Sequence, residues 1–119
     1  MQYMLLIYLD EQQALTESER QDCYVKSAQL AQELHASGHF LAAAPLHPTS
    51  TATTVRKRDG RRVVTDGPFA ETREQLGGYF LIDAKDLDQA MEIAERIPAA
   101  SFGTVEIRPV VEIPVLPAK

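Results

Sequence analysis

The stretch Thr65–Phe80, which reads TDGPFAETREQLGGYF, restricts the fold of this chain more than any other part of the sequence. Gly67 can adopt a positive φ, and Pro68 disfavours the helical region for the residue before it, so the backbone must turn sharply without forming a helix. A strand that leads into this turn presents Asp66 at the end of a sheet, where ligands often bind. Pro68 is also compatible with the first turn of a short helix through Ala70–Leu76.

Two helices are predicted, each from its capping residue and its apolar spacing. Residues 16–19 (TESE) have the spacing of a capping box, so the first helix is expected to begin near Glu17 and to stop at Gly38. Asp86 is expected to cap the second helix, which Pro98 ends. The apolar stripes are Tyr24, Ala28, Ala31 and Leu34 in the first helix, flanked by Cys23 and Leu30, and Leu87, Ala90, Met91, Ala94 and Ile97 in the second.

Six strands are predicted from β-branched or alternating apolar segments. The pair Asp59-Gly60 between two β-branched segments is a strong signal for a hairpin turn. The order is βαβ, a hairpin, then βαβ, which suits an open α+β sheet with both helices on one face. The expected strands are Tyr3–Leu9, Phe40–Ala44, Thr51–Arg58, Arg61–Asp66, Tyr79–Ile82 and Thr104–Ile113.

Two of these strands have no polar face. Tyr3–Leu9 and Tyr79–Ile82 are apolar on both alternating sets of positions, which is typical of central strands that are covered on both sides. Two short helices cannot cover both faces of a sheet, so the second face needs another layer. We therefore expect a homodimer in which the sheets of two copies pack together.

Length and charge limit the classes of function. We expect one domain, residues 1–119, with Pro114–Lys119 as a C-terminal arm. The net charge of −5 argues against nucleic acid or an anionic membrane as the main partner. Cys23 is the only cysteine, which fits a reducing compartment. Met1–Leu9 lacks the basic region of a signal peptide, and no segment approaches the ~20 apolar residues of a membrane span, so we expect a cytoplasmic protein.

A long run of the sequence resembles a known family. DGPFAETREQLGGYFLIDAKDLDQA is similar to the signature of the YCII-related, DGPF-type domain family, and LHPTSTATTVRKRDG and RIPAASFGTVEIRPV also match its pattern. Arg73 stands where many members have lysine. The resemblance implies a ferredoxin-like α+β subunit that pairs into a dimeric α/β barrel. Because DGPF-type members are often encoded beside extracytoplasmic-function sigma factors, it also implies a functional link to a sigma factor.

His47 and Asp66 are the predicted catalytic residues. Pro45 and Pro48 hold His47 in an extended loop, and its imidazole titrates near neutral pH, as acid–base catalysis requires. A neighbouring carboxylate such as Asp66 would fix the tautomer of the imidazole, and the family resemblance implies such a His/Asp pair. In the alternative interpretation, Asp66 only caps its own turn and His47 is a solvated loop residue.

Five further residues are predicted to bind a substrate, and three of them have a simpler interpretation. Arg56 and Arg58 share one face of the hairpin and could hold an anion, although a charged hairpin also deters aggregation of sheets. Pro68 and Phe69 follow Asp66 in the turn. The hydroxyl of Tyr79 could enter a pocket, although such tyrosines more often belong to the core.

Neither a metal nor a cofactor is expected. The three histidines match no compact ligand spacing, and the sequence contains no Gly-rich phosphate loop or dinucleotide fingerprint. Two functions remain open. The first is a cofactor-free enzyme, lyase- or isomerase-like, that acts on a small polar or aromatic molecule through His47 and Asp66. The second is a non-catalytic ligand-binding or regulatory module associated with sigma-factor signalling.

Overall fold

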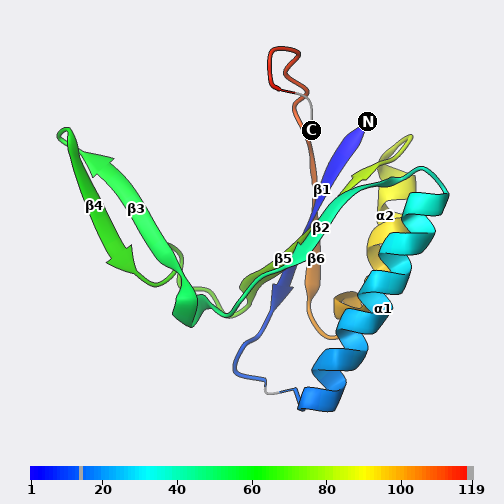
Figure 1. Cartoon of the computed structure of the whole chain (residues 1–119), viewed down its shortest axis with the longest axis horizontal. Helices are drawn as coiled ribbons and strands as arrows, with labels where there is room; N and C mark the ends of the chain where they lie inside the picture. Colours follow the sequence, from blue (N-terminus) through cyan, green and yellow to red (C-terminus); the bar gives the residue numbers. More distant parts are fainter. Residues whose placement is uncertain (14, 118–119) are drawn as a thin grey trace.

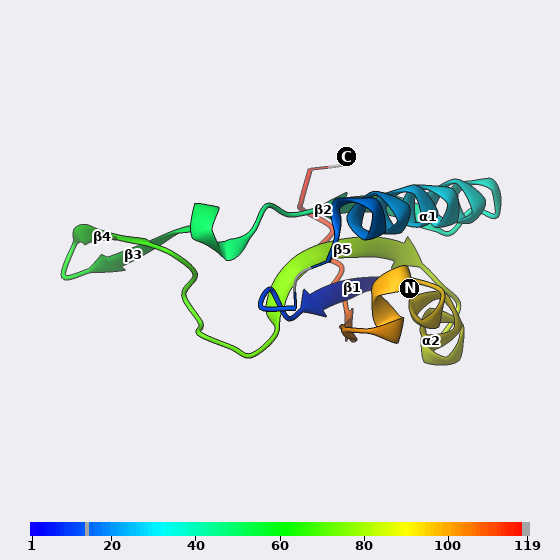
Figure 2. The ribbon, with the colours of Figure 1, turned by 90° about the horizontal axis from the view of Figure 1, so that it is seen from below.

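The computed structural model describes residues 1–13 and 15–117, and within them a four-stranded sheet, two helices and a separate hairpin are formed. Both helices lie on one face of the sheet, and the hairpin extends away from it (Figures 1 and 2). The elements are β1 (Gln2–Leu9), α1 (Glu17–Ala36), β2 (Phe40–Pro45), β3 (Thr53–Arg58), β4 (Arg61–Asp66), β5 (Gln75–Asp83), α2 (Leu87–Glu95) and β6 (Thr104–Pro109), with 3₁₀ turns η1 (Thr49–Thr51) and η2 (Pro98–Ser101).

The sheet has the strand order β2-β5-β1-β6, and every neighbouring pair is antiparallel. Two βαβ units interleave in this order, because β5 inserts between β1 and β2 while β1 inserts between β5 and β6. This is the ferredoxin-like arrangement. The predicted α+β fold with two helices on one face of an antiparallel sheet is therefore confirmed.

The glycine pair lies inside β5 rather than ahead of it. We expected a strand at Tyr79–Ile82, but pairing with β1 begins at Gln75. A β-carbon on Gly78 would stand 3.0 Å from the carbonyl oxygen of Ala44, so the missing side chain lets β2 lie close beside β5. The short helix considered for Ala70–Leu76 does not form, because Gln75 and Leu76 already pair with β1.

The core lies between the sheet and the two helices. Its fully buried side chains include Leu5 of β1, Leu34 of α1, Ile82 of β5 and Ile97, which follows α2. Burial of each such side chain stabilises the fold by about 1.5–3 kcal/mol. The capping residues are as predicted: Thr16 forms a capping box with α1, and the side chain of Asp86 accepts a hydrogen bond from the backbone of α2.

Both predicted helix stripes are partly wrong. In α1, Tyr24 and Ala28 are exposed, because the N-terminal half of the helix extends past the end of the sheet (Figure 1). In α2, Ile93 is buried instead of Leu87 and Met91, which lie toward solvent. The helix is short and rests on the sheet only through the face that carries its alanines and Ile93.

The hairpin of β3 and β4 forms an arm that its own chain leaves uncovered. Every residue of β4 is exposed, and the turn has positive φ at both Asp59 (51°) and Gly60 (74°), as a two-residue hairpin requires. The strand expected from Thr51 begins at Thr53, because Thr51 belongs to η1. The radius of gyration is 16.1 Å, against about 13.5 Å for a compact domain of this length.

The last strand is shorter than predicted. It was expected to continue to Ile113, but β6 ends at Pro109, opposite Tyr3. The backbone N–H of Val110 still donates to the carbonyl of Gln2, where β1 begins, so no strand remains for the following residues to pair with. Residues 110–117 form neither helix nor strand, and 118–119 of the predicted C-terminal arm lie outside the described residues.

Candidate functional site

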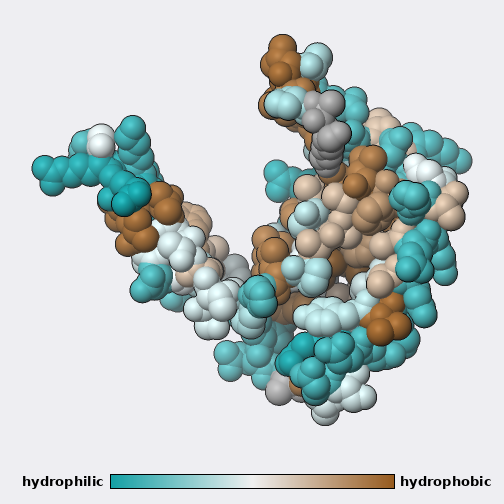
Figure 3. All heavy atoms as spheres, viewed as in Figure 1, coloured by the Kyte–Doolittle hydropathy of each residue, from teal (hydrophilic) through white to brown (hydrophobic). Residues whose placement is uncertain are grey.

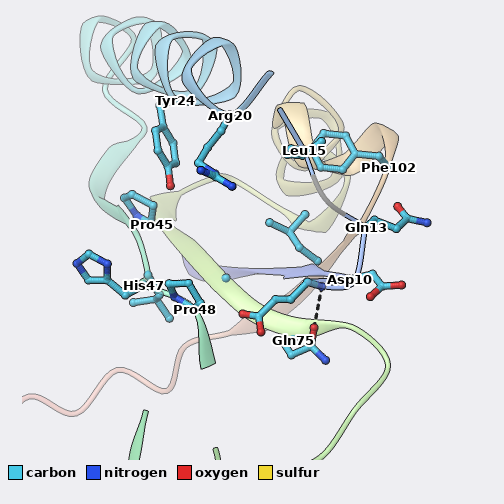
Figure 4. A pocket seen from close by; sticks show the side chains of 14 residues that line it. Asp10, Gln13, Leu15, Arg20, Tyr24, Pro45, His47, Pro48, Gln75 and Phe102 are labelled. Carbon is cyan, nitrogen blue, oxygen red and sulfur yellow. Dashed lines mark hydrogen bonds between the residues drawn. The ribbon is translucent and has the colours of Figure 1, made fainter. Parts of the chain in front are cut away.

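A cavity of about 680 Å³ opens at the end of the sheet where β1 and β2 finish and β5 starts. The overhanging half of α1 forms its roof (Figure 4). This volume suits a small organic molecule, since ligand pockets in proteins typically span about 300–1,000 Å³. Six apolar side chains line it, namely Leu9, Leu15, Pro45, Leu46, Pro48 and Phe102, and its main polar residues are Asp10, Glu11, Arg20, Tyr24, His47 and Gln75.

Glu11 fixes one side of this cavity by joining three segments. Its carboxylate accepts hydrogen bonds from the backbone N–H of Thr49, at 3.0 Å, and from the Thr49 hydroxyl. Its own backbone N–H donates to the side chain of Gln75 at 2.9 Å. These hydrogen bonds connect the loop after β1, the 3₁₀ turn η1 and the start of β5, and the three segments together form one wall of the cavity.

Arg20 and Tyr24 come from α1 and point into the cavity from its roof (Figure 4). They lie four residues apart, so they share one face of the helix. Arg20 forms an ion pair with Glu17 at 3.0 Å, while the described part of the chain offers no hydrogen-bond partner to the Tyr24 hydroxyl. No sequence motif pointed to Arg20, and the helical spacing of Tyr24 predicted a core position for it.

The lengths of α1 and β2 could have indicated this site from the sequence. A helix of 20 residues spans about 30 Å, whereas a strand of six residues spans about 20 Å. Since α1 leads directly into β2, part of the helix must project beyond the strand. The capping box at Thr16 marks the start of α1, so the projecting part is its first turns, which contain Arg20 and Tyr24.

His47 lies at the rim of the cavity, in the loop between β2 and η1 (Figure 4). The backbone N–H of Leu46 donates to the carbonyl of Gly77 at 2.9 Å and holds the start of this loop against β5. The imidazole is exposed. His47 thus lines the cavity, with its ring turned away from the middle of it (Figure 4), and its catalytic role stays a prediction.

Asp66 ends β4 opposite Thr53, at the base of the arm. It does not line the cavity, and among the described residues no hydrogen bond or ion pair joins it to His47. The backbone of the following Gly67 donates to Ala52 at 2.8 Å and accepts from the Thr54 hydroxyl at 2.7 Å, so this turn is anchored to β3. The pairing of His47 with Asp66 stays a prediction.

The five predicted substrate-binding residues do not line the cavity. Arg56 and Phe69 contact each other on the arm, with the guanidinium carbon 4.6 Å from the ring centroid, a cation–π geometry. Arg58 donates to the carbonyl of Lys57, and Pro68 is exposed in the turn. Tyr79 lies in β5 on the face away from the helices, opposite Ala44. Their contacts with a ligand stay a prediction.

Other chemistry near the site is limited by the groups present. Burial and the neighbouring Asp22 raise the pKa of the Cys23 thiol, so this side chain is a poor nucleophile at neutral pH. Within residues 1–13 and 15–117, no group of three or more His, Cys, Asp or Glu side chains is arranged to hold a metal ion. No helix in this part of the chain is long and apolar enough to cross a membrane.

The fold and the comparisons with known proteins agree on the class. The interleaved βαβ units with an inserted hairpin define a ferredoxin-like α+β subunit. The model of the YCII-related domain family matches residues 1–114, and this chain belongs to that family.

Two known proteins are similar to this chain, one in sequence and one in fold. An uncharacterised protein of Rhizobium meliloti (strain 1021) is 38% identical over 113 residues, which cover 92% of this chain and 91% of the relative. Among solved structures, the fold is similar to that of 5-chloro-2-hydroxyhydroquinone dehydrochlorinase (TftG) from Burkholderia phenoliruptrix AC1100, in complex with 2,5-dihydroxybenzoquinone. That likeness has a TM-score of 0.54 and 14% identity, and it covers 93% of this chain and 94% of the enzyme.

Proposed function

We propose that this protein binds a small polar or aromatic molecule in the cavity and acts on it as a cofactor-free enzyme, lyase- or isomerase-like. The observation that carries the proposal is the position of His47 at the rim of a cavity of ligand size. The dehydrochlorinase with the same fold, in complex with a dihydroxybenzoquinone, supports a substrate of this size and kind.

His47 would supply the acid–base step. Exposed side chains exchange rotamers within picoseconds to nanoseconds, so the imidazole can turn over the cavity. In an elimination, one ring nitrogen takes a proton from the substrate while the bond to the leaving group breaks and its electron pair departs with that group. Asp66, at the base of the arm that follows the His47 loop, would fix the tautomer of the imidazole.

A second copy of the chain would complete the assembly as a homodimer. The sheet face away from the helices is largely apolar, and the arm exposes Val55, Val63 and Val64 (Figure 3). Exposed apolar side chains such as those of the arm are typical of interaction surfaces when they cluster. The apolar residues of the sheet face are the half-buried Met4, Leu6, Ala42, Ala44 and Tyr79 and the buried Leu81.

Charge favours a second copy over another partner. Residues 53–66 hold five Lys or Arg and two Asp, a net charge of +3. Since the whole chain has a net charge of −5, the other residues together carry −8. Near the arm tip, Lys57 lies opposite Arg62 and Arg58 opposite Arg61, pairs of like charge that destabilise an isolated hairpin. A negatively charged partner would stabilise such a tip, and the rest of a second copy carries a net charge of −8.

The proposed enzyme is tested with the substrate of the structural neighbour as a probe. Purified protein is incubated with 5-chloro-2-hydroxyhydroquinone, and chloride release is followed. We expect release above the uncatalysed rate, and its loss in His47→Ala, while His35→Ala, at the far end of α1, keeps the rate of the wild type. Binding of 2,5-dihydroxybenzoquinone without chloride release would instead favour the non-catalytic or regulatory module, including a sigma-factor link.

The predicted pair is tested through the tautomer of His47. Nitrogen-15 NMR distinguishes a protonated from an unprotonated ring nitrogen, and we expect Asp66→Asn to redistribute these two forms in His47. Asp59→Asn, at the tip of the same arm, removes an equal charge and should leave them unchanged. Identical His47 spectra in wild type and Asp66→Asn would contradict the pair.

A further inference from the structure

We infer that the roof of the cavity, formed by Arg20 and Tyr24, is an anion-binding subsite, and that the ligand is a planar aromatic acid with a hydroxyl at its opposite end. This inference rests on the proposed function, since it names the class of molecule that the cavity takes. It assigns the substrate-binding role to α1 instead of to the basic residues of the arm.

The roof presents hydrogen-bond donors that the protein uses only in part. The Arg20 guanidinium has five N–H donors in a fork that matches a carboxylate, and one of them contacts Glu17. That contact is an ion pair on the exposed surface of a helix, with 73% of the Glu17 side chain accessible, so it holds the arginine only weakly. Tyr24 adds a hydroxyl that is not engaged by the described residues.

The opposite side of the cavity presents acceptors. Asp10 lies across the cavity from Arg20 (Figure 4), and its Oδ1 accepts from the backbone N–H of Gln12 at 2.9 Å. Its second oxygen has no hydrogen-bond partner in the described residues, whereas both oxygens of Glu11 bind Thr49. Asp10 therefore repels an anionic group and accepts a hydrogen bond from a hydroxyl, which orients the ligand with its acid toward α1.

Apolar side chains separate these two poles. Leu9, Leu46 and Phe102, with the prolines of the His47 loop, give the cavity apolar walls. An aromatic ring fills such a space and keeps its polar substituents at the two ends. We therefore infer a single aromatic ring with its acid and its hydroxyl in para positions, so that the acid contacts the roof and the hydroxyl contacts Asp10.

The inference is tested with two probes of equal shape. 4-Hydroxybenzoate and 4-hydroxybenzamide differ in the charge of one group, and isothermal titration calorimetry gives the Kd of each. We expect the acid to bind at least about tenfold more tightly than the amide, since hydrogen bonds to charged groups are the stronger ones. Arg20→Gln should weaken the acid about tenfold and leave the amide unchanged, and Tyr24→Phe should weaken it less.

Lys26→Gln is the matched control. Lys26 lies on the same helix, is exposed and has its own ion pair with Asp22 at 3.0 Å, but it does not line the cavity. We expect Lys26→Gln to bind the acid as the wild type does. Equal loss in Arg20→Gln and Lys26→Gln would show a general charge effect and overturn the inference.

Three other results would also overturn it. These are equal binding of acid and amide, unchanged binding in Arg20→Gln, and no binding of the acid. The first two leave ligand binding in the cavity intact, so they separate this inference from the proposed enzyme, which the chloride assay tests independently.

Discussion

Gly103 and Gly67 restrict the chain through different physical effects. A β-carbon on Gly103 would stand 2.4 Å from the carbonyl oxygen of Tyr8, so this position excludes any side chain by contact. Gly67 has open space around it but a φ of +107°, so only its backbone conformation excludes a side chain. The second effect follows from the local sequence, while the first depends on how β6 packs against β1.

Gly103→Ala is therefore expected to destabilise the protein more than Gly67→Ala. Overpacking against backbone costs about 1–3 kcal/mol, while a side chain at positive φ costs about 1 kcal/mol. Urea denaturation followed by circular dichroism gives both free energies of unfolding. A Gly67→Ala protein as stable as the wild type would contradict the strained turn.

Glu19 gives the first turn of α1 a dependence on pH. The backbone N–H of Thr16 donates to its carboxylate at 2.9 Å, and this hydrogen bond lowers the pKa of Glu19 below its ordinary value. The stabilisation is therefore present above the unfolded-state pKa, about 4.3, and is lost as pH falls through the lower folded-state pKa.

Glu19→Gln should remove this part of the acid sensitivity, because glutamine keeps the capping hydrogen bond without a titrating group. We expect the decrease in Tm between pH 7 and pH 3 to be smaller in Glu19→Gln than in the wild type. Glu95→Gln, which has no capping role, provides the comparison. An equal decrease in all three proteins would argue against the capping box as its source.

At the scale of elements, α1 has two functions along its length. Its C-terminal half packs Leu30 and Leu34 into the core, while its N-terminal half overhangs the cavity. Leu34→Ala should therefore cost about 2–5 kcal/mol of stability, whereas Tyr24→Ala should cost below about 1 kcal/mol, as expected of an exposed position. Comparable losses in thermal denaturation would restore the core role that the sequence pattern predicted for Tyr24.

The features predictable from the sequence are those that depend on neighbouring residues. The capping box at Thr16, the cap at Asp86 and the turn at Asp59-Gly60 are local, and each is present. The face that α1 buries and the length of β6 depend on which distant strand lies opposite, so periodicity alone misplaced them.

The same distinction applies to the candidate site. His47 could be selected from its two flanking prolines, and it lines the cavity. Arg20 and Tyr24 become site residues only because α1 outreaches β2, which is a relation between two elements rather than a motif. The basic residues of the arm were selected because they cluster in sequence; they do not line the cavity, and their contact with a ligand stays a prediction.

At the scale of the whole molecule, the uncovered arm and the apolar sheet face predict a homodimer. Light scattering at micromolar concentration should give about twice the monomer mass of 13.2 kDa. Leu6→Asp on the open sheet face should dissociate or unfold this dimer, because it buries an unpaired charge. Glu112→Gln, in the exposed C-terminal segment, should stay dimeric. A stable wild-type monomer would contradict the proposed assembly.

We propose that ligand binds at the end of the sheet under α1 and not on the arm. A crystal structure of the protein soaked with 2,5-dihydroxybenzoquinone distinguishes the two places. We expect the ring between the apolar walls of the cavity, an oxygen within hydrogen-bond distance of Arg20 or Tyr24, and His47 turned toward the ring. A ligand bound beside Arg56 and Phe69, with the cavity empty, would contradict it.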